Sequence, residues 1–199
     1  MSAKRVILYI VAAIVLLLAG GAAWMLGPAL LPPEAIEAGI AKNEKAPIDL
    51  ELRDSSGQST TLAQNMGEKG MVLYLVRSAD WCPFCKAQMV RTEKIRENIE
   101  GRGYALAALS YDAPEVLASF AGENGLKYAF LSDTGSKMID ALGLRDPQYG
   151  EGSFAYGVPR ASILVLAPDG TVKAKYVAAD YRSRPSNDEV LAMIGRADM

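Results

Sequence analysis

The hydrophobic pattern of the chain begins with one long apolar stretch and then changes to short periodic segments. Residues 6–26, VILYIVAAIVLLLAGGAAWML, carry no charge. Residues 48–52 alternate as a half-buried strand does, and residues 54–57 form a turn into a second strand. Residues 71–76, MVLYLV, are uniformly apolar, which is typical of a central strand that is covered on both faces.

Helices and strands alternate along the rest of the chain. Asp112, followed by Glu115, predicts a capped helix start, and Pro168–Gly170 predicts a hairpin turn. The expected elements are a helix that starts at residues 82–85 and continues to about residue 100, a strand over 104–110, a helix over 112–124, a strand over 128–131, a helix over 135–142, strands over 161–167 and 171–177, and a helix over 187–194. This order predicts a three-layer α/β fold with a mixed central sheet, in a domain that spans residues 46–199.

The apolar stretch 6–26 is long enough for a transmembrane helix. As a helix it would span roughly 31 Å, which matches the hydrocarbon core of a bilayer. Lys4 and Arg5 precede it and glutamates follow it, so the positive-inside tendency predicts a cytoplasmic N-terminus over residues 1–5. Residues 27–45 would then be a linker, and the domain would lie outside the cytoplasm, in the periplasm or an equivalent compartment.

Two other interpretations of this stretch remain open. Gly21 and Ala23 are small residues of the kind found at a signal-peptide cleavage site. A buried core helix fits less well, because the stretch has no polar face. The anchor and the signal peptide both deliver the domain to a compartment where disulfides persist.

Composition excludes several classes of function. Half of the 199 residues are hydrophobic, so the chain is not disordered by composition. The formal charge is −2 and Lys and Arg form no run, which argues against nucleic-acid binding. The chain has no histidine and only two cysteines, so a histidine-dependent triad and a structural zinc site are both excluded. We expect neither a metal nor another cofactor.

The two cysteines stand together in the sequence WCPFC, residues 81–85, directly after the apolar strand. Cys82 and Cys85 are therefore expected at the N-terminus of the next helix, where unpaired N–H groups and the helix dipole favour a thiolate. Pro83 suits the first helical position, because its missing N–H is not needed there. Trp81 would form an apolar wall beside the thiol. The spacing lets each sulfur resolve a mixed disulfide formed at the other.

A structural staple and a metal site are the alternatives to a redox pair. A disulfide that closes so small a loop constrains the unfolded chain little and stabilises the fold modestly. Structural disulfides usually join distant segments. We therefore interpret the pair as redox-active.

These residues carry a resemblance to a known family. The chain resembles the thioredoxin superfamily, and within it the alkyl hydroperoxide reductase/thiol-specific antioxidant (peroxiredoxin-like) branch, over roughly residues 43–192. The motifs occur in the family's order: Ala46–Leu50 with the turn at 54–57, Trp81–Cys85 after a strand, Ser110–Asp112, Leu131–Asp133, Tyr156–Arg160 and Pro168–Gly170. The resemblance implies a thioredoxin-like fold and a redox activity.

The resemblance also implies roles for three further residues. Pro159 precedes a strand where thioredoxin-like proteins carry a cis-proline that faces the sulfurs. Arg160 occupies the place of an arginine that stabilises the thiolate and the departing peroxide oxygen in the peroxiredoxin branch. Arg77 is a second candidate for that electrostatic role.

Two departures from the family pattern leave the reaction open. With Cys85 placed as the peroxide-attacking cysteine, Ser78 replaces the motif's proline and Cys82 replaces its threonine. The favoured function is thiol–disulfide exchange, with Cys82 attacking and Cys85 resolving. The alternatives are a thiol peroxidase, in which Cys85 attacks a hydroperoxide, and a redox-inert binding domain. Expected partners are a protein thiol or disulfide, or a peroxide, together with a redox protein that donates or accepts electrons.

Overall fold

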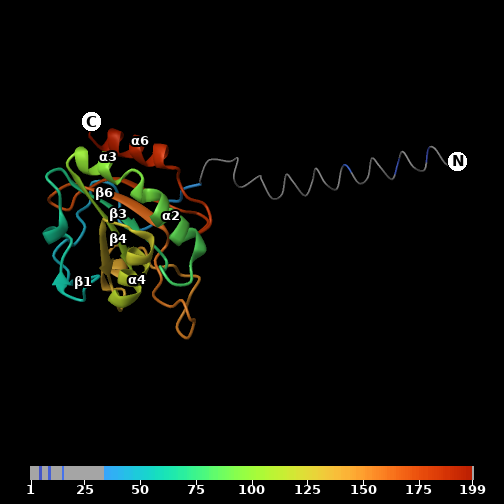
Figure 1. The fold of residues 1–199 in the computed structure, drawn as a ribbon, viewed down its shortest axis with the longest axis horizontal. Coiled ribbons are helices and arrows are strands. Elements are labelled where there is room, and N and C mark those ends of the chain that lie inside the picture. Colours follow the sequence, from blue (N-terminus) through green and yellow to red (C-terminus); the bar gives the residue numbers. More distant parts are fainter. Residues whose placement is uncertain (1–4, 6–8, 10–14, 16–33, 199) are drawn as a thin grey trace. The chain divides into compact units, whose positions relative to one another are not determined.

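The structure is a computed structural model that describes Arg5, Tyr9, Val15 and residues 34–198. Most of the expected transmembrane stretch, and with it the alternative signal peptide, lies outside the described residues. Of the helices that the described residues form, none has the length and apolar character of a membrane span. A compact unit begins at Glu34 and contains all the strands and helices discussed below (Figure 1).

A seven-stranded mixed sheet forms the centre of this unit (Figure 1). Its order is β2-β1-β5-β4-β3-β6-β7, with β3, β4 and β5 parallel and the remaining neighbours antiparallel. The strands are β1 (Leu52–Asp54), β2 (Ser59–Thr60), β3 (Gly70–Leu75), β4 (Tyr104–Ser110), β5 (Ala129–Ser132), β6 (Ser162–Leu166) and β7 (Val172–Val177). The mixed sheet that the sequence predicts is confirmed.

Helices cover both faces of the sheet. They are the short 3-10 helix η1 (Ala63–Asn65) and the α-helices α2 (Pro83–Glu93), α3 (Arg96–Gly101), α4 (Pro114–Asn124), α5 (Lys137–Ala141) and α6 (Asn187–Ala197). Alternate residues of β3 belong to two separate cores. Val72 and Tyr74 pack in the core that contains α2, α3, α4 and α6 residues, whereas Leu73 and Leu75 pack in the core that contains α5.

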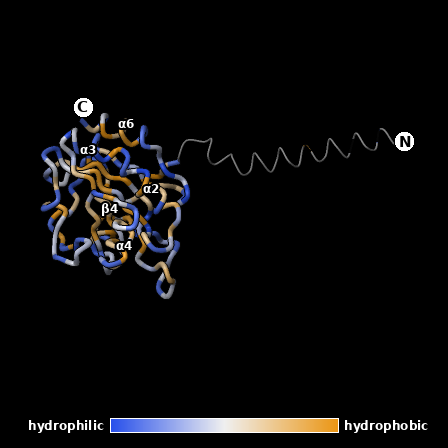
Figure 2. The backbone as a smooth tube through the Cα atoms, in the orientation of Figure 1, coloured by the Kyte–Doolittle hydropathy of each residue, from blue (hydrophilic) through white to orange (hydrophobic). Residues whose placement is uncertain are grey.

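The hydrophobic positions are concentrated in the central strands, and the hydrophilic positions lie mostly in the outer loops (Figure 2). Every residue of β3 and β6 is buried, as a strand covered on both faces requires. The two cores and the sheet between them give the three layers that the sequence predicts.

Two expected elements differ in the structure. The helix expected from the cysteines to about residue 100 is broken at Ile95, whose φ is −110° and ψ is 3°, so that α2 and α3 are separate. Ile95, at the break, and Ile99 of α3 are buried in the same core as Met89 of α2. The strand expected over residues 48–52 lies later in the chain, because β1 spans Leu52–Asp54 and overlaps the expected range only at Leu52.

The prediction that Asp112 caps a helix is wrong. Helix α4 begins at Pro114, and its N-cap is Ala113, which makes no side-chain cap hydrogen bond. The carboxylate of Asp112 turns away from α4 and accepts hydrogen bonds from Ala79 N at 2.6 Å and Ser78 Oγ at 2.9 Å. Asp112 therefore orders the loop that follows β3, which leads to the cysteines.

Residues 34–45, which the sequence assigns to the linker, are part of the compact unit and pack against its sheet. Ala35 pairs with Ala178, and Ile36 N donates to Val177 O at 2.9 Å. Apolar side chains of this segment, including Ile36 and Ile40, contact the α5-side core. The segment therefore covers the end of β7.

Candidate active site

The two cysteines lie where β3 passes through a short loop into α2. Cys82 is the N-cap of α2, and Cys85 lies in its first turn. The two sulfurs form a disulfide, and the Cα atoms are 5.3 Å apart. Cys82 Sγ also accepts a hydrogen bond from Cys85 N at 3.3 Å, and Pro83 fills the first helical position. The expectation that the pair sits at the beginning of a helix is therefore confirmed.

Both cysteines are covered in the disulfide form. Cys82 is 1% exposed and Cys85 is 0% exposed. Phe84, between them in sequence, packs edge-on against Tyr181 with ring centroids 5.9 Å apart. Because the pair is buried, covering side chains have to move before a partner's sulfur or a peroxide oxygen reaches either cysteine.

Trp81 lies beside the pair and is held from two sides. Its ring packs edge-on against Phe154 with centroids 5.3 Å apart, and its Nε1 donates to Tyr111 Oη at 3.1 Å. Trp81 is partly buried against the core that also contains the cysteines. The apolar wall expected at this position is present.

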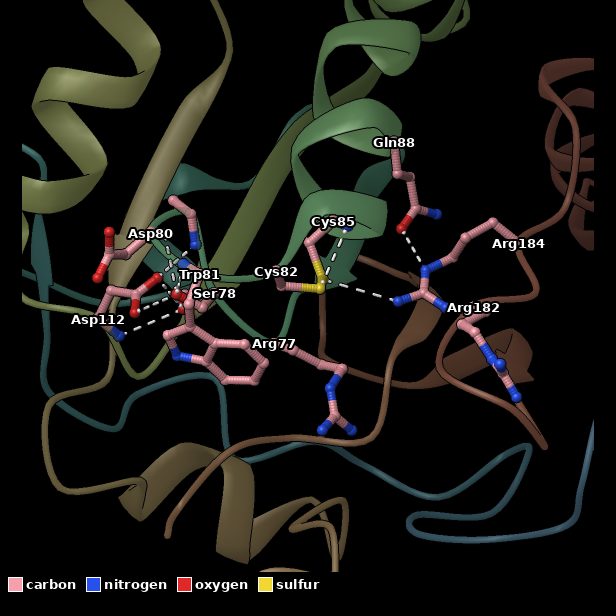
Figure 3. The surroundings of a disulfide bond; sticks show 12 residues. Arg77, Ser78, Asp80, Trp81, Cys82, Cys85, Gln88, Asp112, Arg182 and Arg184 are labelled. Carbon is pink, nitrogen blue, oxygen red and sulfur yellow. Dashed lines mark hydrogen bonds between the residues drawn. A yellow bond between two sulfur atoms is a disulfide. The ribbon is translucent and has the colours of Figure 1, made fainter. Parts of the chain in front are cut away.

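Asp112 fixes the backbone just before the cysteines (Figure 3). Besides Ser78 and Ala79, Ser110 Oγ donates to it at 2.8 Å. Burial raises the pKa of Asp112 above its ordinary value, although these hydrogen bonds act in the opposite direction. The residue was not recognised from the sequence as part of the site, because the motif around it is equally typical of a helix cap.

Arg184 is a second residue of this site that sequence reasoning missed. It lies between β7 and α6, and its Nη2 is 3.7 Å from Cys85 Sγ (Figure 3). Its Nε donates to Gln88 Oε1 at 2.9 Å and its Nη1 to Ser183 O at 2.8 Å. Burial lowers the pKa of Arg184 to about 10, so the side chain remains a cation at neutral pH. No motif surrounds it, and 99 residues separate it from Cys85.

Arg77 is buried at the end of β3, but it contacts neither sulfur by a hydrogen bond. Its Nη1 is 2.5 Å from Asp146 Oδ2, and both side chains are at most 5% exposed. The guanidinium also lies over the rings of Tyr149 and Tyr181, 4.9 Å from each centroid, and 5.7 Å from that of Trp81. Arg77 thus joins the loop before the cysteines to two other loops.

The prediction of a cis peptide bond before Pro159 is wrong. The Val158–Pro159 bond is trans. Asp146 N donates to Val158 O at 2.9 Å, and Arg160 N donates to Leu144 O at 2.7 Å. These two bonds flank Pro159 and hold its segment extended against its neighbour, which an ordinary trans peptide allows.

Arg160 is half-buried and lines a pocket of about 300 Å³ that Arg77 also lines. Within the described residues, no hydrogen bond joins Arg160 to either sulfur. The structure therefore brings Cys82, Cys85, Trp81, Pro83 and Arg184 together, and it places Arg160 in the pocket. In the same part of the chain, no three Cys, Asp or Glu side chains are grouped as a metal site requires.

Known proteins resemble the chain in both sequence and structure. The Escherichia coli protein named peroxiredoxin Bcp is 26% identical over 140 residues, which is 70% of this chain and 86% of that protein. The thiol-disulfide oxidoreductase ResA of Halalkalibacterium halodurans is 28% identical over 107 residues, 53% of this chain and 59% of that protein.

Solved structures share the fold at low sequence identity. Peroxidoxin BcpB from Mycobacterium tuberculosis superposes with a TM-score of 0.62 at 16% identity, covering 82% of this chain and 97% of the other. Peroxiredoxin Q of Xanthomonas campestris gives a TM-score of 0.64 at 19% identity, covering 80% and 97%. These likenesses establish the thioredoxin-like fold. A family model described as AhpC/TSA family matches residues 43–175, and the protein therefore belongs to the AhpC/TSA family.

Proposed function

We propose that the protein is a thiol–disulfide oxidoreductase that uses Cys82 and Cys85 as its redox pair. The observation that carries this proposal is the bond between the two sulfurs at the N-terminus of α2. A thiolate formed there is stabilised by backbone N–H groups and by the helix dipole. The intact, bonded pair argues against a redox-inert binding domain.

In the proposed reaction the reduced protein transfers two electrons to a disulfide. The Cys82 thiolate attacks one sulfur of the substrate disulfide, forms a mixed disulfide and releases the first thiolate. Cys85, as a thiolate, then attacks Cys82 Sγ, which closes the protein disulfide and releases the second thiolate. A redox protein that donates electrons completes the cycle, or accepts them when the reaction runs in the opposite direction.

A thiol peroxidase is the second candidate, and the contact between Arg184 and Cys85 favours it. A cation at 3.7 Å from Cys85 Sγ supports a thiolate at that sulfur. The Cys85 thiolate would attack a hydroperoxide, giving a sulfenic acid and an alcohol. Cys82 would then attack the sulfenic sulfur, forming the disulfide and releasing water. Membership of a family whose relatives include a named peroxiredoxin supports this candidate as well.

The proposal places the catalytic domain at a membrane surface. The uncharged stretch 6–26 is the proposed anchor, with Lys4 and Arg5 on the cytoplasmic side and the domain on the other side. A compartment outside the cytoplasm would allow the disulfide to persist between reaction cycles. This part of the proposal rests on the sequence alone.

A comparison of two oxidants tests the proposed reaction. The full-length protein is reduced, freed of reductant and mixed rapidly with either a protein disulfide or hydrogen peroxide. The change in tryptophan fluorescence, to which Trp81 beside the pair contributes, reports closure of the pair. We expect the larger second-order rate constant with the disulfide. A larger rate constant with peroxide would establish the peroxidase, and no reaction with either oxidant would contradict both functions.

Replacing Arg184 with glutamine is expected to raise the pKa of the Cys85 thiol and to slow its alkylation at pH 7 by about tenfold. A hydrogen bond to a charged group contributes about 1.5–3 kcal/mol, and a factor of ten corresponds to about 1.4 kcal/mol. Ultraviolet thiolate absorbance against pH measures the shift in the Cys82→Ser background, where Cys85 is the only thiol.

Two further variants separate this electrostatic effect from a general loss of packing. Arg184→Lys keeps the charge and should retain part of the pKa shift. Arg196→Gln removes an exposed arginine of α6 and should leave the thiolate titration unchanged. An unchanged Cys85 titration in Arg184→Gln would show that Arg184 only packs against the pair.

A further inference from the structure

The pocket that Arg160 lines is rich in arginine. Its volume is about 300 Å³, which is at the lower end of the range for small-molecule sites. Residues 178–179 and other side chains line it together with three arginines and two carboxylates. These charged residues are Arg77, Arg160, Arg182, Asp146 and Asp180. Figure 3 shows Arg77 and Arg182 among the residues that surround the disulfide.

The carboxylates of the pocket are already paired. Asp146 binds Arg77, and Asp180 binds Arg182 through contacts of 3.0 and 3.2 Å. Within the part of the chain that the structure describes, no carboxylate lies within 4.0 Å of Arg160, since none of the ion pairs there includes it. The pocket therefore carries one unbalanced positive charge.

Arg77 adds a second observation that indicates a ligand. The residue is 1% exposed, and among the described residues its one hydrogen bond runs from Nη1 to Asp146. Its Nε is buried without an acceptor. A buried donor without a partner costs about 1–3 kcal/mol, so a ligand oxygen that reached Nε after the surrounding rings moved would be bound favourably. Guanidinium groups match carboxylates geometrically, because both are planar and can form two parallel hydrogen bonds.

One aromatic residue connects the pocket to the redox pair. Tyr181 lines the pocket, and its ring packs against Phe84, which lies between the two cysteines. A molecule held in the pocket therefore contacts Tyr181, whose ring in turn contacts Phe84 between the two cysteines. Because both cysteines are buried, a substrate in the pocket reaches the sulfurs only after covering side chains move.

We infer that this pocket binds the carboxylate of a low-molecular-weight disulfide and holds the substrate's sulfur toward the redox pair. The inference rests on the proposed exchange reaction and assigns its substrate class. The reduced Cys82–Cys85 pair supplies two electrons to the substrate disulfide, whose S–S bond breaks to give two thiols. The protein S–S bond forms, and the protons of the two cysteine thiols leave with the products or enter solvent.

Two aromatic disulfides test the inference, because one carries carboxylates and the other does not. The reduced full-length protein is mixed with dithiobis(nitrobenzoate) or with neutral dithiodipyridine, and the second-order rate constants are compared as a ratio. We expect Arg160→Gln to lower the ratio of the carboxylate to the neutral reagent by about tenfold, since a hydrogen bond to a charged group contributes about 1.5–3 kcal/mol. Arg196→Gln, which removes the same charge at a remote exposed site, should keep the wild-type ratio.

The remaining outcomes would contradict either the carboxylate-binding pocket or the proposed exchange reaction. An equal fall with both reagents would show that Arg160 acts on the sulfurs rather than on a carboxylate. If the ratio fell by the same factor in Arg196→Gln as in Arg160→Gln, the effect would come from the overall charge of the protein and not from the pocket. Wild-type protein that reacts with neither reagent would contradict the proposed exchange reaction itself. Circular dichroism of each variant confirms that the compared proteins are folded.

Discussion

Replacing Cys82 with serine is expected to abolish disulfide exchange, with a fall in rate of more than about a thousandfold, the scale on which loss of a covalent nucleophile acts. A serine hydroxyl stays protonated at neutral pH and does not replace the thiolate. The variant keeps Cys85, but a single thiol cannot both attack the substrate and resolve the mixed disulfide. Turnover with a protein disulfide as substrate measures the loss.

The matched variant Cys85→Ser is expected to fail at a different step. Cys82 still attacks, but no thiol resolves the product, so a mixed disulfide accumulates and mass spectrometry detects it at Cys82. Rapid formation of a sulfenic acid at Cys85 when Cys82→Ser meets hydrogen peroxide would reverse the assignment and support the peroxidase. The two variants therefore determine which sulfur attacks first.

Replacing Asp146 with alanine is expected to lower the free energy of unfolding by about 3–5 kcal/mol. Asp146 and Arg77 are both buried, and the loss of Asp146 leaves the Arg77 charge without a counter-ion. The rings of Tyr149 and Tyr181 lie against the guanidinium, but their attraction to a cation contributes only about 0.5–2 kcal/mol. Chemical denaturation of the reduced and oxidised forms measures the change.

Two comparisons make this prediction specific to the buried pair. Asp140→Ala breaks the more exposed pair with Arg145 and should cost less than about 1 kcal/mol. The double variant Arg77→Met with Asp146→Leu removes both charges and should recover most of the stability, because no buried charge remains unpaired. Equal losses in Asp146→Ala and Asp140→Ala would contradict the role assigned to the buried pair.

The parts of the fold that local patterns determine could be predicted from the sequence. Residues 104–110 form β4 with the expected bounds, because an apolar run between glycine and a polar turn favours a central strand. The start of α2 at Pro83 also follows the sequence, because proline suits the first helical position. Both predictions needed only neighbouring residues.

The parts that depend on distant contacts could not be predicted. The sequence around Asp112 is typical of a helix cap, but its carboxylate orders the loop around Ser78 and Ala79 instead. Arg184 reaches Cys85 only because the chain after β7 folds back over α2. The break between α2 and α3 has no proline or glycine to mark it, and packing of Ile99 in the core accompanies it.

The pairing of Ala35 with Ala178 has a practical consequence for any shortened form of the protein. A version that begins at residue 46 would lose the strand-like partner of the end of β7 and leave backbone donors and acceptors there open to solvent. Unprotected sheet edges recruit other chains, so such a version is expected to self-associate. The stretch that carries Arg184 follows directly, and truncation would loosen its attachment point as well. Shortened forms intended for kinetics should therefore retain Glu34 and everything after it.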